Sequence, residues 1–231
     1  MTGKIRFLFV MVYITSYASF CQDKIIINRS LEDFASEMRF VGSTPGRSYL
    51  NLEGSEYLDE NFVSGQILTL NAECFKDIPM RYNAFIDNIE VRLPNGKIYD
   101  LTDPAQIFQI LLNKNVLVYT DYLSNDEKRK GFLFLLYDGD SKLYRRNYKT
   151  YKEGTPSNGI IPEISSKIVD KPKEYYIKIG NELARIFNSK KDLLNIMNSH
   201  ASEMDDFLKR ERTKLNQDDD LIKVLTFFDS L

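Results

Sequence analysis

The chain has 231 residues, a formal net charge of −2 and a single histidine, His200. This mildly acidic balance gives no overall attraction for nucleic acid or for an anionic membrane surface, so we expect no nucleic-acid partner. One histidine excludes histidine-based catalytic triads and zinc sites with several histidine ligands. The phosphate-binding patterns G-x-x-x-x-G-K-[ST] and G-x-G-x-x-G are also absent from the sequence.

The first 21 residues have the order typical of a secretory signal peptide. Lys4 and Arg6 precede an apolar run over residues 7–14, and small or polar residues follow over 15–19. The run is too short to cross a bilayer, which takes about 20 apolar residues, and no later segment comes close. We therefore predict an exported protein, periplasmic or associated with the outer membrane, whose mature chain has no transmembrane segment.

Cys21 lies where a lipoprotein cysteine would lie, but the residue before it is the bulky Phe20. Lipid attachment to Cys21 is therefore disfavoured. Ser19 and Cys21 meet the need of signal peptidase for small side chains if cleavage falls before Gln22. We expect a soluble mature chain without an internal disulfide, because Cys74 would be its only cysteine.

Residues 22–47 form a lead-in to the main domain. Ser30 and Asp33 have the spacing of a capping box at the start of a helix. One helical face carries Leu31, Phe34, Met38 and Val41. The pattern predicts a short amphipathic helix in this lead-in.

Residues 48–187 read as an antiparallel β-rich domain. Short apolar or alternating runs cover residues 67–70, 81–86, 89–93, 116–119, 132–137, 175–179 and 182–187. Turn residues that tolerate positive φ separate several of them, at residues 94–96, 138–139 and 180–181. Residues 104–112 fit a short helix or a strand, and we favour a strand. This pattern predicts a β-meander that closes into a barrel or folds into a sandwich.

Two further segments complete the predicted organisation. Residues 153–173 contain three prolines and two glycines with little periodicity, and they are expected to form a long surface loop. Residues 188–231 are predicted to form two amphipathic helices packed on the sheet, the first capped by Ser189 and the second beginning at Asp218. The fold class is therefore α+β, an antiparallel β-meander followed by two C-terminal amphipathic helices.

The best candidate for ligand binding is the predicted strand over residues 142–152, which has five cations and three tyrosines. Aromatic rings beside guanidinium groups can stack on flat ligands and hold phosphate or carboxylate. The candidate binding residues are Lys142, Tyr144, Arg145, Arg146, Tyr148 and Lys149. The alternative is a solvent-facing strand whose charges discourage pairing at a sheet edge.

Other groups of polar residues give weaker signals. Residues 138–141 (Asp-Gly-Asp-Ser) resemble the start of a calcium loop, but the later ligands of such a loop are missing and a hairpin turn is favoured. The carboxylates of Glu56, Asp59 and Glu60 could supply an acid–base pair for glycoside cleavage, although nothing in the sequence determines their separation. His200 falls on the apolar stripe of the first predicted C-terminal helix. We predict no catalytic residue, no metal ligand and no cofactor.

Several stretches resemble a family of small exported β-rich proteins of Bacteroidota-type bacteria that has no known activity. The matching residues are 48–50, Phe62, Gly65, 77–83, 174–178 and 190–193. The resemblance covers most of residues 48–231 and leaves out the lead-in. It implies an extracytoplasmic β-rich fold with a helical tail, and it carries over no active-site residue.

These observations favour a non-enzymatic envelope protein that binds another envelope protein or a cell-surface glycan. Two alternatives stay open at this point. One is a carboxylate-based hydrolase acting on envelope glycan. The other is a small-ligand carrier with an apolar cavity inside a barrel.

Overall fold

A computed structural model describes residues 41–42, 52–101, 104–157 and 164–231. The predicted signal peptide, its cleavage before Gln22 and nearly all of the 22–47 lead-in lie outside these residues. The described part of the lead-in is β1 (Val41–Gly42), which pairs with β5 (Ile98–Asp100). Within the described residues, no helix is both long and apolar enough to cross a membrane.

The first half of the chain forms an antiparallel meander. Its strands are β2 (Val63–Thr69), β3 (Cys74–Asn83), β4 (Asn88–Arg92) and β5, and β6 (Ile107–Leu112) pairs with the free edge of β2. The prediction of a strand in residues 104–112 is confirmed, after a 3₁₀ turn, η1 (Pro104–Gln106). Cys74 begins β3 and is buried. The prediction that the mature chain has no internal disulfide depends on the removal of Cys21. This residue lies outside the described residues.

The second half closes into a five-stranded barrel, so the choice between barrel and sandwich is settled for these strands. They are β7 (Asn115–Ser124), β8 (Glu127–Asp138), β9 (Ser141–Arg146), β12 (Glu174–Ile179) and β13 (Ala184–Ile186). The barrel is closed by β13, which runs parallel to β7 and pairs Ala184 with Tyr122. All other pairings between strands are antiparallel among the described residues.

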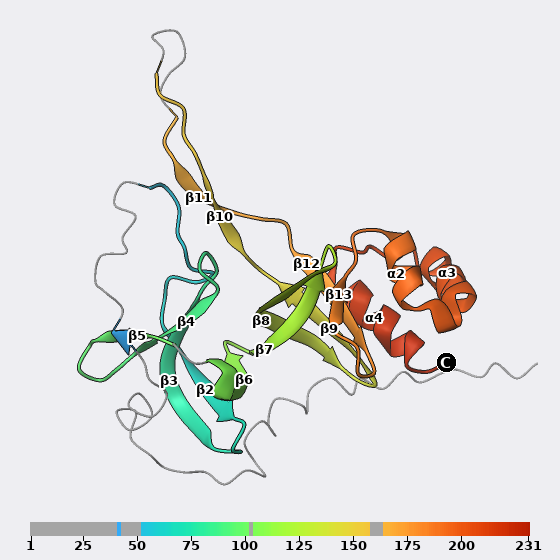
Figure 1. Cartoon of the computed structure of the whole chain (residues 1–231), viewed down its shortest axis with the longest axis horizontal. Coiled ribbons are helices and arrows are strands. Elements are labelled where there is room, and N and C mark those ends of the chain that lie inside the picture. Colours follow the sequence, from blue (N-terminus) through green and yellow to red (C-terminus); the bar gives the residue numbers. More distant parts are fainter. Residues whose placement is uncertain (1–40, 43–51, 102–103, 158–163) are drawn as a thin grey trace, which may run out of the picture.

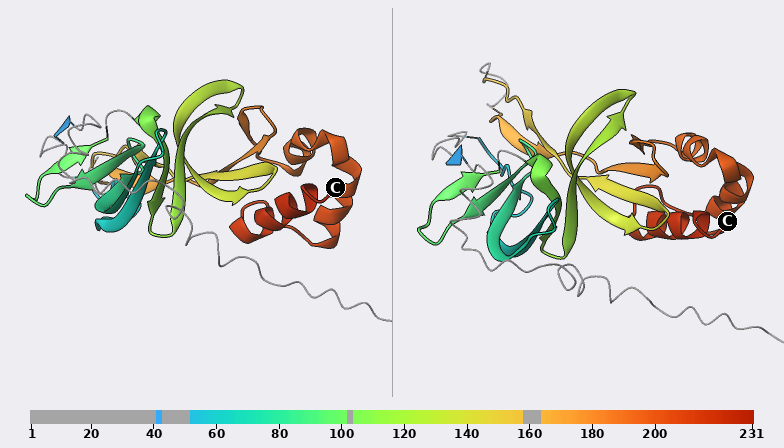
Figure 2. Two further views of the ribbon diagram at one scale, coloured as in Figure 1. Left: turned by 90° about the horizontal axis from the view of Figure 1, so that it is seen from below. Right: turned by 60° about the horizontal axis from the view of Figure 1, so that its bottom comes forward.

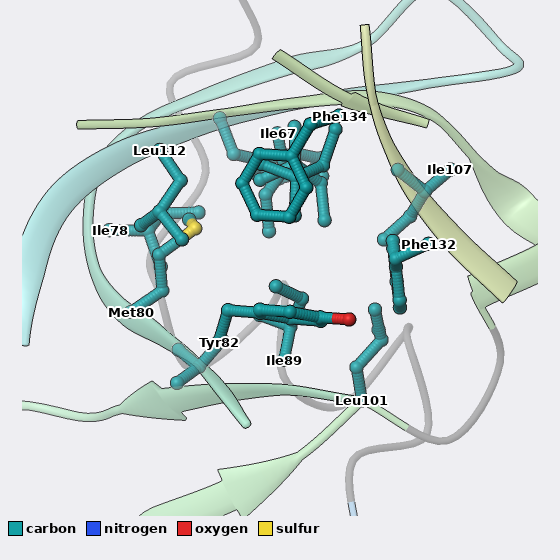
Figure 3. Packing of buried hydrophobic residues seen from close by; sticks show 14 of the residues in the cluster. Ile67, Ile78, Met80, Tyr82, Ile89, Leu101, Ile107, Leu112, Phe132 and Phe134 are labelled. Atoms are coloured by element: carbon teal, nitrogen blue, oxygen red, sulfur yellow. The ribbon is translucent and has the colours of Figure 1, made fainter. Parts of the chain in front are cut away.

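The meander and the barrel have separate cores. The meander core gathers side chains of β2, β3, β4 and β6 around Tyr82, whose ring meets Phe132 and Phe134 of β8 edge-on at 6.3 and 5.6 Å between centroids (Figure 3). The barrel interior is filled by a second cluster, Tyr122, Leu133, Tyr144, Tyr176 and Ala184. A filled interior gives no support to a carrier whose ligand would sit inside this barrel.

The C-terminal region has three α-helices where the sequence predicted two. They are α2 (Lys190–Ile196), α3 (Ala201–Arg210) and α4 (Asp218–Phe228), with a 3₁₀ turn, η2 (Asn198–His200), between the first two. The first predicted helix is interrupted because Met197 (φ −94°, ψ 34°) and His200 (φ −133°, ψ 33°) leave the helical conformation. Polar residues in this turn, such as Asn198, compete for main-chain hydrogen bonds and weaken a helix.

The start of α2 and the packing of the helices agree with the sequence. The Ser189 hydroxyl accepts the N–H of Asp192 at 3.1 Å, as a capping residue does. The helices lie at the end of the barrel away from the meander (Figure 2). Their apolar faces pack on Leu143 of β9 and on Tyr175 and Ile177 of β12.

A two-stranded arm leaves the body between β9 and β12. It consists of β10 (Lys149–Lys152) and β11 (Lys167–Asp170) and extends away from both cores (Figure 1). Two predictions were wrong here: the single strand over 142–152 is interrupted at residues 147–148, and part of the predicted loop over 153–173 is β11. The sequence of β11 shows little periodicity because Ile168 is its only buried residue.

Candidate functional site

The strand predicted to bind a ligand, residues 142–152, lies in the body as β9 and in the arm as β10. Tyr144 points into the barrel interior and is 6% exposed. Burial raises the pKa of its hydroxyl to about 12, with a smaller contribution from the charge of Asp138. Tyr144 therefore serves the barrel core and cannot stack on an external ligand.

Arg145 points the other way, toward the helices. Its guanidinium forms an ion pair with Asp218, the first residue of α4. The Tyr175 hydroxyl also donates to Asp218, at 2.7 Å, and Lys173 lies 3.6 Å from the same carboxylate. Burial, followed by the hydrogen bond to Asp218, raises the pKa of Tyr175. Arg145 was predicted to face a ligand, but its side chain instead joins the barrel to α4.

Arg146 lies in a polar cluster of the barrel strands. It pairs with Glu174 at 3.2 Å, and its guanidinium lies 4.4 Å from the centre of the Tyr148 ring. The Tyr176 hydroxyl donates to the same Glu174 oxygen at 2.7 Å. The pKa of Tyr176 is raised, first by burial and then by this hydrogen bond. The predicted pair of Arg146 and Tyr148 thus exists, but both side chains are engaged within the protein.

The two lysines of the predicted site are paired as well. Lys142 forms an ion pair with Asp138 across the β8–β9 turn. Lys149 lies 3.3 Å from Asp170 in the arm, with its side chain 11% exposed. The six candidate residues therefore do not form one open surface. The alternative of a solvent-facing edge strand is wrong for β9 as well, because β9 pairs with β8 on one side and β12 on the other.

Two of the three carboxylates considered for glycoside cleavage, those of Glu56 and Asp59, hold loops in place. Glu56 accepts the side-chain amide of Asn83 at 2.8 Å, and Asp59 accepts the N–H of Asn61 at 2.9 Å. Glu60 contributes its main-chain oxygen to Arg81 at 3.0 Å. None of these hydrogen bonds joins two of the three carboxyl groups.

The predicted turn over residues 138–141 is held by the end of α4. The Asp229 carboxylate accepts the N–H of Ser141 at 3.1 Å and the Tyr137 hydroxyl at 2.9 Å. Among the described residues, no three or more side chains form a group suited to a metal ion. His200 packs its ring against Phe228, with 6.0 Å between centroids.

A half-buried carboxylate joins the meander to the barrel. Asp87, in the β3–β4 turn, accepts the hydroxyl of Tyr82 at 2.6 Å and the N–H of Phe132 at 3.2 Å. Burial raises the pKa of Asp87, and the two hydrogen bonds oppose that rise. A side chain at Gly131 would lie 2.2 Å from the carboxylate, so this approach needs a glycine. The contact is internal and leaves no room for a ligand.

An open groove lies between the barrel and α2. It consists of two cavities of about 460 and 410 Å³, which share Arg185, Asn195 and Ile196 in their walls. One cavity extends toward the β12–β13 turn and Asn198, and the other extends toward the β7–β8 turn and Asn188. We call this feature the α2 groove. The shared residues make the two cavities neighbours along α2.

Four asparagines line the α2 groove: Asn125, Asn188, Asn195 and Asn198. Aliphatic side chains form the apolar part: Leu123, Ile177, Ile179, Leu183, Ile186 and Ile196. A surface of this kind offers hydrogen-bond donors and acceptors without charge, next to patches that accept C–H groups.

The charged groups of the groove are few and mostly acidic. They are Asp126, Glu182, Arg185 and Asp192. Arg185 lies 3.9 Å from Glu182, and both side chains are exposed. Hydrogen bonds from Ser189 and from the N–H of Asn188 lower the pKa of Asp192, so its carboxylate stays ionised.

The α2 groove was not predicted from the sequence. Its walls come from the β7–β8 turn, β13 and α2, which are distant in the chain. One signal was present: Asn188, Asn195 and Asn198 are spaced so that they fall near one face of a helical segment. Comparisons of the chain with family models, curated proteins and solved structures find no match.

Proposed function

We propose that this protein is an exported, non-enzymatic binding module of the cell envelope, and that its α2 groove holds a neutral cell-surface oligosaccharide. The observation that carries the proposal is the pair of neighbouring cavities that four asparagines line. A carboxamide both donates and accepts hydrogen bonds, and it therefore matches the paired hydroxyl groups of a sugar.

The sheet favours a sugar over an extended peptide in this place. Peptides often bind by adding a strand to a free sheet edge. The strand along the groove, β13, is already paired with β7 on one side and β12 on the other. Recognition there must come from side chains, which suits a ligand rich in hydroxyl groups.

Charge and size favour the same class of ligand. Three acidic side chains and one arginine line the groove, so an anionic polysaccharide would be repelled. The two cavities have the volume of ordinary ligand sites, which is roughly 300–1,000 Å³. A short neutral oligosaccharide that spans both cavities fits these conditions.

The groove is better suited to binding than to hydrolysis. Glycoside cleavage needs one carboxyl group that stays protonated near neutral pH. Hydrogen bonds from Ser189 and from the N–H of Asn188 lower the pKa of Asp192. Asp192 therefore does not fit the role of the general acid in glycoside cleavage.

The test is calorimetric titration of the mature chain with a tetramer of N-acetylglucosamine and a tetramer of glucose. We expect saturable binding of at least one tetramer and at least a tenfold loss of affinity in Asn195→Leu and in Asn188→Leu. The matched control is Asn216→Leu, an exposed asparagine outside the groove, which should bind as the wild type does. Absence of binding to both sugars, or equal loss in the control, would overturn the proposal.

A further inference from the structure

The two cavities of the α2 groove differ in their aliphatic walls. The cavity at the β12–β13 turn, which we call the β12–β13 cavity, is lined by Ile177, Ile179 and Leu183 in addition to the shared residues. Ile177 is buried, whereas Ile179 and Leu183 are half-buried. The shared Ile196 of α2 is also half-buried. The β12–β13 cavity therefore has an aliphatic wall that a bound group can contact.

The charges of the two cavities differ as well. In the wall of the β12–β13 cavity the charged residues are Glu182 and Arg185, whose side chains have opposite charges and lie 3.9 Å apart. The other cavity, which we call the β7–β8 cavity, has Arg185 together with two carboxylates, those of Asp126 and Asp192. The charges of the β12–β13 cavity are therefore balanced, and its walls favour a neutral group.

Polar side chains that can bind an amide lie beside the aliphatic wall. Asn195, Asn198 and Ser199 line the β12–β13 cavity and are exposed. Among the hydrogen bonds of the described residues, none involves the side chains of these three residues. A carboxamide has N–H donors and an oxygen acceptor, so it can both donate to and accept from a second amide.

A plain hexose makes poor use of this combination of groups. Its hydroxyl groups point outward around the ring, and a hydroxyl placed against an aliphatic wall loses hydrogen bonds to water without replacement. An acetamido group has an N–H, a carbonyl oxygen and a methyl group. Its methyl group can cover the aliphatic wall while its amide pairs with a carboxamide.

We propose that the β12–β13 cavity recognises the acetamido group of an N-acetylated amino sugar, with the methyl group against Ile179 and Leu183. This inference rests on the proposed function and adds the substrate class, an N-acetylhexosamine oligosaccharide. One methyl group removed from water contributes about a fourfold gain in affinity, and one hydrogen bond contributes a further gain of roughly two- to tenfold. We therefore expect a preference of about tenfold over the same sugar without the acetamido group.

The test is calorimetric titration of the mature chain with three tetramers that have the same linkage: N-acetylglucosamine, glucose and glucosamine. The N-acetylglucosamine tetramer should bind about tenfold more tightly than the glucose tetramer. The glucosamine tetramer has ammonium groups in place of acetamido groups, and it should bind more weakly than the N-acetylated tetramer. Tightest binding of the glucosamine tetramer would show that the acidic side chains select a cation, and it would overturn the inference.

Two matched variants locate the preference in one cavity. Leu183→Ser removes part of the aliphatic wall of the β12–β13 cavity, so the preference should fall below about threefold while the affinity for the glucose tetramer is unchanged. Leu123→Ser makes the same change in the β7–β8 cavity and should leave the preference in place. An equal loss of preference in the two variants would overturn the assignment. The comparison of the three sugars on the wild type does not depend on the folding of either variant.

The outcomes distinguish this inference from the proposed function. Equal affinity of the wild type for the N-acetylglucosamine and glucose tetramers would keep the α2 groove as a sugar site and would overturn only the recognition of the acetamido group. Absence of binding to all three tetramers would overturn both.

Discussion

Arg145 of β9 and Asp218 of α4 form an ion pair that joins the barrel to the last helix. The two side chains are 12% and 27% exposed, and Tyr175 donates to the same carboxylate. A charged residue that the sequence suggested for ligand binding therefore fixes a helix on the barrel.

Removal of the Arg145 side chain should destabilise the protein. In Arg145→Ala the Asp218 carboxylate loses its main cation while it stays largely covered, and we expect a loss of about 1–3 kcal/mol in the free energy of unfolding. Urea denaturation measures this change. The control Arg129→Ala breaks an exposed pair with Glu127 and should cost less than about 1 kcal/mol. Equal losses in the two variants would contradict a stabilising role for the Arg145 pair.

Asp87 should make stability depend on pH. Its pKa is raised in the folded protein, so the folded state holds a proton that the unfolded state releases first. Its contribution to stability is therefore full below about pH 4 and is lost as the pH rises through the folded pKa. The free energy of unfolding of the wild type minus that of Asp87→Asn, measured by denaturation over this range, should fall as the pH rises. A rise of this signed difference with pH would contradict the assignment.

The close approach of Asp87 to β8 should make Gly131 intolerant of any side chain. In Gly131→Ala the new methyl carbon would meet the carboxylate at 2.2 Å, so we expect a loss of about 1–3 kcal/mol. Urea denaturation of Gly131→Ala and of the double variant with Asp87→Ala tests this reason. The loss caused by Gly131→Ala should be smaller when Asp87 is absent. If Gly131→Ala costs the same free energy of unfolding with and without the Asp87 side chain, the added methyl group does not act through a clash with Asp87.

Processing of the N-terminus should release a chain that begins at Gln22. Signal peptidase is expected to cut after Cys21, because Phe20 is a poor residue before a lipid-modified cysteine. Intact-mass analysis of the protein from the envelope fraction measures the cut. Labelling of the wild type by radioactive palmitate, lost in Cys21→Ser, would contradict release as a soluble chain.

Local patterns in the sequence predicted most strands and the helical tail. Turns such as residues 94–96 were recognisable, and Gly96 has the positive φ (79°) that such a turn needs. The closure of the barrel was not predictable in this way, because Ala184 pairs with Tyr122 without any local signature. The break of the first C-terminal helix at Met197 was missed because the apolar stripe continues across it.

The candidate site was less predictable than the fold. Arg145 and Arg146 carry the charge and aromatic neighbours of a binding strand, but their carboxylate partners Asp218 and Glu174 come from later elements. Only the tertiary fold shows that these cations are already paired. The α2 groove likewise needs three distant segments, so the spacing of its asparagines in the sequence could not by itself reveal the groove.

The most direct test of the proposed binding function is to map the sugar on the protein by NMR. Amide signals of the mature chain are followed during titration with the N-acetylglucosamine tetramer. We predict that the perturbed signals cluster on Asn125, Arg185 and Asn195, which line the α2 groove. Perturbations confined to the arm or to the surface around Arg81, or none at all, would contradict the account.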